Sequence, residues 1–66
     1  MKITVNGEAN EVEPGITVRQ LVDSLELGRG PVAVERNADV VKRADHETTV
    51  LREGDVVEIV HFVGGG

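Results

Sequence analysis

Only one segment of this 66-residue chain has the spacing of an amphipathic α-helix. Thr17 and Gln20 stand three residues apart, as in a capping box, in which each side chain accepts a hydrogen bond from the other residue's backbone N–H. Apolar residues then recur at i, i+3, i+4 and i+7, as Val18, Leu21, Val22 and Leu25. Gly28 is suited to end the helix, and Pro31 bars its continuation. A single apolar stripe is most economically buried across one face of a sheet.

Short strands are predicted on both sides of this helix. Residues 2–5 alternate polar and apolar, and Asn6-Gly7 follows, a pair that tolerates φ > 0 and strongly indicates a β-hairpin. The returning strand is expected over residues 8–13, with a turn at Pro14-Gly15. Further extended segments and turns are expected over residues 32–35, at Asn37, and over residues 40–41, 48–51, 52–55 and 56–62.

The most apolar strands are the first and the last, so we expect them to pair at the centre of the sheet. One helix across one face of such a mixed sheet predicts an α+β fold of the ubiquitin-like β-grasp type. Sixty-six residues leave room for one domain, which we assign to residues 1–63, with a flexible glycine tail at residues 64–66.

The chain ends in three glycines, Gly64, Gly65 and Gly66, directly after the last predicted strand. Glycines are also common in chain ends that are merely disordered. Here no polar spacer precedes them, and a tail without Cβ atoms can pass through a narrow channel with its carboxyl carbon open to attack. We therefore expect the tail to deliver the Gly66 carboxylate into the active site of another protein.

Side chains that would make the chain a catalyst are few. Its only serine, Ser24, lies in the predicted helix, and its histidines, His46 and His61, are far apart in sequence. No residues have metal-ligand spacing, and no glycine-rich phosphate loop precedes the helix. The sequence predicts a protein that is not an enzyme, with no catalytic residue, no metal site and no cofactor of its own.

Charge and hydropathy narrow the class of partner. The chain has 12 acidic and 7 basic residues, a net charge of −5 that a phosphate backbone would repel. No apolar run approaches the ~20 residues of a membrane span, and there is no recognisable secretory signal. We expect a cytoplasmic protein, monomeric when free, that binds neither nucleic acid nor membrane and meets a protein with a basic surface.

The last predicted strand indicates where such a partner docks. Its period of two gives one face with Val57, Ile59 and His61, and a second with Val56, Glu58, Val60 and Phe62. Because Glu58 should face solvent, Val60 and Phe62 are expected beside the tail as an exposed apolar patch. The alternative is that Phe62 folds back onto the edge of a small core.

Five segments together point to a known family. They are Asn6-Gly7, the helix start at Thr17, residues 34–37, residues 52–55 and, above all, residues 58–66. These motifs span essentially the whole chain and resemble the ThiS branch of the ThiS/MoaD family, the sulfur carriers of thiamin biosynthesis. A terminal Gly-Gly alone is shared with MoaD-type carriers and ubiquitin, and the third glycine departs from the minimal motif.

The resemblance implies a specific chemistry at Gly65 and Gly66. In this family a ThiF-type enzyme uses ATP and magnesium to adenylate the terminal carboxylate, here that of Gly66, and a sulfur-donor enzyme allows its conversion to a thiocarboxylate. The thiocarboxylate supplies sulfur for the thiazole ring on a ThiG-type synthase. The alternatives are a ubiquitin-like modifier joined to lysines, a MoaD-type carrier for molybdopterin, and a plain interaction domain with a disordered end.

Overall fold

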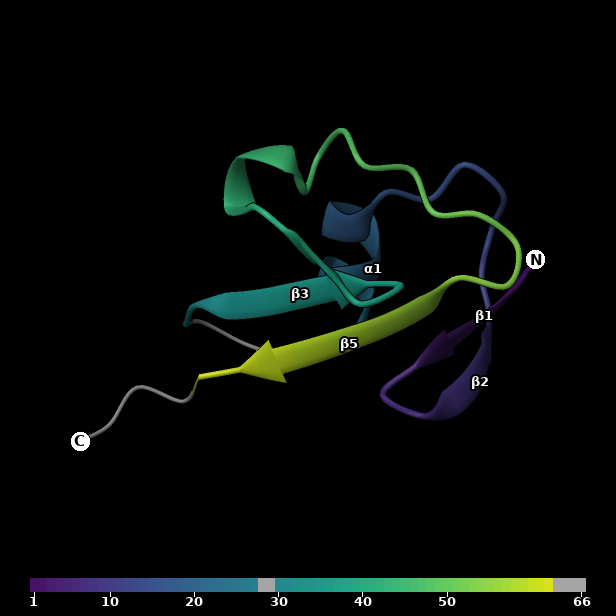
Figure 1. Cartoon of the computed structure of the whole chain (residues 1–66), viewed down its shortest axis with the longest axis horizontal. Coiled ribbons are helices and arrows are strands. Elements are labelled where there is room, and N and C mark those ends of the chain that lie inside the picture. Colours follow the sequence, from purple (N-terminus) through teal and green to yellow (C-terminus); the bar gives the residue numbers. More distant parts are fainter. Residues whose placement is uncertain (28–29, 63–66) are drawn as a thin grey trace.

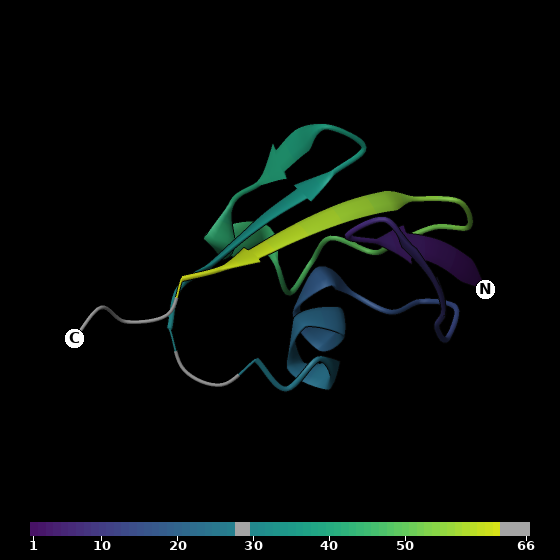
Figure 2. The same cartoon turned by 90° about the horizontal axis from the view of Figure 1, so that it is seen from below.

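The computed structural model describes residues 1–27 and 30–62, which form a five-stranded sheet with one α-helix on one side of it (Figure 1; Figure 2). The elements are β1 (Lys2–Val5), β2 (Glu8–Glu11), α1 (Val18–Ser24), β3 (Val32–Arg36), β4 (Asp39–Val41), the short 3₁₀ helix η1 (Arg43–Asp45) and β5 (Val56–His61).

The strand order is β2-β1-β5-β3-β4, so the first and last strands are neighbours near the centre of the sheet. β1 and β5 run parallel, with Thr4 opposite Val56 and Val5 opposite Val57. The other three strand pairs are antiparallel. The predicted α+β fold of the β-grasp type is confirmed.

Two tight turns connect neighbouring strands. Asn6 and Gly7 have φ of 49° and 82° and join β1 to β2, as their sequence predicts. Asn37 and Ala38, with φ of 51° and 72°, join β3 to β4 in the same region of backbone space, although alanine is rarely found there. β2 ends at Glu11 rather than residue 13, because Glu11 pairs with the first residue of β1.

α1 begins as predicted and ends early. The Gln20 N–H donates to Thr17 Oγ1 at 3.1 Å, and the Thr17 N–H donates to Gln20 Oε1 at 3.0 Å, so the capping box is confirmed. The helix ends at Ser24, whose hydroxyl donates to the Leu21 carbonyl at 2.7 Å, and Glu26 adopts a left-handed φ of 52°. The predicted stop at Gly28 lies outside the described residues.

The segment 48–51 does not form a strand of the sheet. Val50 makes an isolated bridge with Thr17, and the Leu51 N–H donates to the Ile16 carbonyl at 2.9 Å. The sequence predicts an extended segment here, and its pairing partner is the chain that enters α1 rather than a strand of the sheet. The pairing closes the core on one side, where Leu51 is buried.

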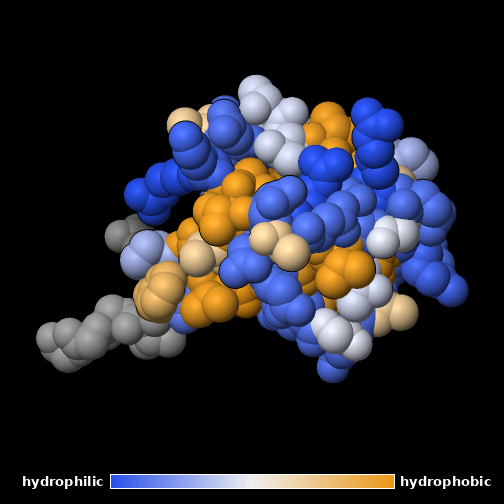
Figure 3. All heavy atoms as spheres, viewed as in Figure 1, coloured by the Kyte–Doolittle hydropathy of each residue, from blue (hydrophilic) through white to orange (hydrophobic). Residues whose placement is uncertain are grey.

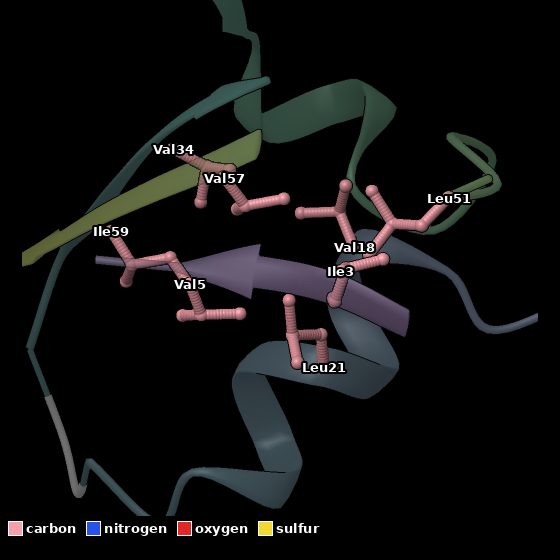
Figure 4. Packing of buried hydrophobic residues seen from close by; sticks show 8 residues of the cluster. All are labelled: Ile3, Val5, Val18, Leu21, Val34, Leu51, Val57 and Ile59. Carbon is pink, nitrogen blue, oxygen red and sulfur yellow. The ribbon is translucent and has the colours of Figure 1, made fainter. Parts of the chain in front are cut away.

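One apolar core fills the space between the sheet and α1 (Figure 4). Each fully buried Val, Leu or Ile contributes about 1.5–3 kcal/mol, so the alternation along β1 and β5 determines which face of the sheet turns inward. The buried members come from three strands, the helix and the loop before β5: Ile3, Val5, Val18, Leu21, Val34, Leu51, Val57 and Ile59.

Candidate functional site

β5 leads along the middle of the sheet to the predicted tail (Figure 1). Phe62 is the last described residue, and Val63, Gly64, Gly65 and Gly66 lie outside the described residues. The role of Gly66 as the modified residue therefore stays a prediction. What the structure shows is how the fold holds and presents the end of β5.

The side chain of Asn6 holds one edge of β5. Its Nδ2 donates to the Ile59 carbonyl at 3.2 Å, and its Oδ1 accepts from the Ile59 N–H at 2.7 Å. β1 ends at Val5, so the amide continues the hydrogen-bonded ladder beyond the end of that strand. Asn6 therefore has two functions here, since it also makes the first turn.

Gly30 and Pro31 hold the other edge of the same strand end. The Phe62 N–H donates to the Pro31 carbonyl at 3.0 Å. Gly30 has φ of 126°, and a Cβ atom there would lie 2.7 Å from the Phe62 carbonyl oxygen. Only glycine permits this approach. Sequence analysis missed it, although a Gly-Pro pair just before a predicted strand was the available signal.

The two faces of β5 are as the sequence predicts. Val57 is fully buried and Ile59 is 8% exposed, whereas Val60 and Phe62 are 53% and 52% exposed on the other face, together with Glu58. The alternative in which Phe62 packs onto the core is wrong. The docking role of Val60, Phe62 and Glu58 stays a prediction.

The exposed patch continues onto β3 and β4. Ala33 lies opposite Val60, and Val40 of β4 is 73% exposed. Figure 3 shows hydrophobic side chains at the surface between polar ones. Sequence analysis did not find this extension, because which strand lies beside β5 is decided by the tertiary fold. We define the outer face as the exposed side chains of β3, β4 and β5, together with Phe62, on the side of the sheet away from α1.

A buried carboxylate holds the opposite end of β5. Asp55 is 6% exposed; its Oδ2 accepts from the Arg52 N–H at 2.8 Å and from Arg36 Nε at 3.0 Å, and its Oδ1 accepts from Asn37 Nδ2 at 3.0 Å. Burial by itself would raise the pKa of Asp55. The hydrogen bonds from Arg52 and Asn37, together with the Arg36 charge, outweigh burial and lower its pKa.

The two histidines differ in exposure: His46 lies inside the domain, whereas His61, the last residue of β5, is partly exposed. His46 is buried, with Nε2 3.1 Å from the Val41 carbonyl oxygen, which is a structural contact. Among residues 1–27 and 30–62, no three His, Cys, Asp or Glu side chains are grouped as a metal site would require. Over the same ranges, no helix is long and apolar enough to cross a membrane.

Comparison with known proteins identifies the family. The model of the ThiS family matches residues 3–66. The chain belongs to the ThiS family. It is 42% identical over 50 residues to the sulfur carrier protein ThiS of Bacillus subtilis, an alignment that covers 76% of each chain. The fold of this ThiS-family chain also matches the crystal structure of the thiamine biosynthesis protein ThiS from Geobacter metallireducens, with a TM-score of 0.83, 35% identity and complete coverage of both chains.

The chain is also similar to part of two longer enzymes. Over all 66 residues it is 47% identical to a thiazole synthase of Magnetococcus marinus and 38% identical to one of Paramagnetospirillum magneticum. It spans 20% of the length of each. A ThiS-like segment is thus contained in both of these proteins.

Proposed function

We propose that this ThiS-family protein is a sulfur carrier for thiamin biosynthesis, with the Gly66 carboxylate as the attachment point. The observation that carries the proposal is the family match over residues 3–66, which includes the glycine end. The similarity to a protein named as a sulfur carrier supports it. The similarity to two proteins named as thiazole synthases favours the thiazole ring as the destination of the sulfur, and a ThiG-type synthase as a partner.

The proposed chemistry begins with an unreactive group. A free carboxylate is ionised at neutral pH and is a poor electrophile. In the first step a carboxylate oxygen of Gly66 attacks the α-phosphorus of ATP, which forms the acyl adenylate and releases pyrophosphate. In the second step a sulfide-equivalent donor attacks the acyl carbon. The bond between that carbon and the AMP oxygen breaks, AMP leaves, and a thiocarboxylate remains. ATP and magnesium are held by a ThiF-type enzyme, and a separate enzyme supplies the sulfur.

The folded domain supplies the affinity in this proposal. Fixing a four-residue segment in an enzyme channel costs about 4–8 kcal/mol of backbone entropy, and glycines bring no side chains to offset it. The side chains of Val60, Phe62 and Glu58 are exposed within the last five described residues of the chain and can make the compensating contacts. We therefore assign docking of the activating enzyme to the outer face.

The test is reconstitution with a ThiF-type enzyme. The chain, ATP, magnesium and labelled pyrophosphate should give exchange of label into ATP, and Gly66→Val should give none. Adding a sulfur donor should change the intact mass by the replacement of one oxygen with sulfur, and the same spectrum shows whether any terminal glycine has been removed. Lysine-linked conjugates in cells would support a modifier instead, and no exchange with a ThiF-type enzyme known to be active would contradict the proposal.

A further inference from the structure

Two glutamates face each other on the outer face. Glu35 of β3 lies directly opposite Glu58 of β5, and both are exposed. Two residues along the ladder, the Asn37 N–H donates to the Val56 carbonyl at 2.7 Å. Bonded positions alternate in an antiparallel pair, so Glu35 and Glu58 also form a hydrogen-bonded pair, with Cα atoms about 5.5 Å apart. Like charges placed this way destabilise a sheet.

Neither Glu35 nor Glu58 forms an ion pair with another described residue. The ion pairs among residues 1–27 and 30–62 involve other carboxylates. Arg36, the residue next to Glu35, places its side chain toward the other side of the strand, where its Nε lies 3.0 Å from Asp55 Oδ2. The fold therefore uses the adjacent cation elsewhere and leaves two carboxylates side by side at the surface.

Exposed apolar side chains surround the acidic pair. Val40 of β4 lies opposite Glu35 and is 73% exposed, and Val56 and Val60, two residues to either side of Glu58, are 45% and 53% exposed. Ala33, opposite Val60, completes the apolar rim around the two carboxylates. Paired carboxylates within an apolar rim are complementary to a long basic side chain, whose methylene groups pack on the valines.

Arginine fits this pair of carboxylates and its apolar rim better than lysine or a metal ion does. A guanidinium has five N–H donors in a planar fork and can bond both carboxylates at once. A hard cation such as calcium needs six to eight oxygens, which two carboxylates do not supply. The described residues add no third acidic or histidine ligand to form such a site.

We propose that Glu35 and Glu58 bind an arginine side chain of the enzyme that activates the terminal carboxylate, and so select that enzyme. The proposal rests on the proposed function and adds the chemistry of the partner's surface. Glu58 lies four residues, or about 13 Å along a strand, before Phe62. An arginine held at the pair therefore sets the distance from the docking point to the chain that follows Phe62. The repulsion between the two carboxylates is the stability cost of this selectivity.

The experiment compares the double variant Glu35→Gln/Glu58→Gln with Glu47→Gln. Glu47 is exposed and follows His46, whose carbonyl accepts from the Arg19 N–H, so it lies on the helix side. Affinity for the purified activating enzyme is measured by calorimetry without ATP, at low and high salt, with thermal unfolding alongside. We expect at least tenfold weaker binding by the double variant, a difference that shrinks at high salt, and an unchanged or higher melting temperature. Glu47→Gln should bind within about twofold of the unchanged protein.

The second variant, Glu35→Lys, tests the site independently of any effect that the double glutamine substitution has on folding. It forms an opposite-charge pair with Glu58, so the sheet should become more stable while binding weakens further. Binding by both variants equal to that of Glu47→Gln would overturn the arginine site. If the unchanged protein is adenylated and these variants bind normally, only this proposal fails. If the unchanged protein binds the enzyme but is never adenylated, the proposed function fails instead.

Discussion

The two ends of β5 are built differently. At its start, a buried carboxylate, Asp55, accepts hydrogen bonds from three residues and fixes the turn before the strand. At its far end, the backbone is held from the edges by Asn6 and Pro31, and the side chains of Val60 and Phe62 are exposed. The first end contributes stability, and the second presents a surface and a direction for the chain that follows. Substitutions at the two ends should therefore have opposite signatures.

Gly66→Val, a substitution beyond the far end of β5, should have the largest effect on adenylation and almost none on stability. We expect adenylation by a ThiF-type enzyme to fall at least about 100-fold, because a branched side chain hinders the carboxyl carbon and misplaces it in a narrow channel. The free energy of unfolding should change by less than about 0.5 kcal/mol. Pyrophosphate exchange and urea unfolding measure the two quantities, and an unchanged exchange rate would contradict the prediction.

Asp55→Ala, at the start of β5, should reduce stability and leave adenylation unchanged. Its loss leaves the Arg52 N–H, the Asn37 amide and the Arg36 guanidinium without their common acceptor. We expect a destabilisation of about 2–4 kcal/mol in urea unfolding, with normal adenylation at temperatures where the variant is folded. Asp39→Ala, at an exposed position, is the control and should cost less than about 0.5 kcal/mol. Equal costs for the two variants would refute the structural role of Asp55.

Gly30→Ala should disturb both stability and presentation. A Cβ atom at Gly30 would lie 2.7 Å from the Phe62 carbonyl oxygen, so the strand end must move. The matched control is Gly15→Ala, since Gly15 also has a positive φ of 89° but has nothing within 4 Å of its Cβ position. Both should lose about 1–2 kcal/mol from backbone strain. Only Gly30→Ala should lose more than this and also slow adenylation; equal behaviour would mean that the close approach does not position the tail.

Phe62→Asp should weaken docking without unfolding the domain. Phe62 is half exposed, so its removal leaves no cavity in the core. We expect about tenfold weaker binding to the activating enzyme, which corresponds to about 1.4 kcal/mol. The control is Val50→Asp. Val50 is 46% exposed, but it lies on the helix side of the sheet, in the segment that pairs with Thr17 at the start of α1. A large fall in melting temperature for Phe62→Asp would place the docking surface elsewhere.

The smallest expected effect is on the pH dependence of stability. The pKa of Asp55 is lowered in the folded protein, so the unfolded chain binds its proton more readily. The stabilisation from Asp55 is therefore complete above its ordinary pKa of 3.8 and is lost as pH falls below that value toward the lower folded pKa. Unfolding of the unchanged protein and of Asp55→Asn, followed from neutral to acidic pH, should give a stability difference that narrows as pH falls. A constant difference would contradict this assignment.

Local signals were sufficient for much of this fold. Asn6-Gly7 predicted the first hairpin, Thr17 and Gln20 predicted the helix start, and the period of two along β5 predicted which side chains face the core. Each of these features depends on residues within a few positions of one another, so the sequence alone could specify them. The family was also recognisable from sequence, because its motifs are spread along the whole chain.

The tertiary structure decided what depends on distant segments lying side by side. Gly30 approaches Phe62 across 32 residues of chain, and Glu35 meets Glu58 only because β3 is the neighbour of β5. Asp55 became a structural carboxylate in the same way, through contacts with Arg36 and its neighbour on the β3–β4 turn. No local pattern encodes these contacts, since strand order is set by packing the whole apolar core against α1. The sequence by itself determined the elements and the family, and the packing of those elements decided which residues surround the end of β5.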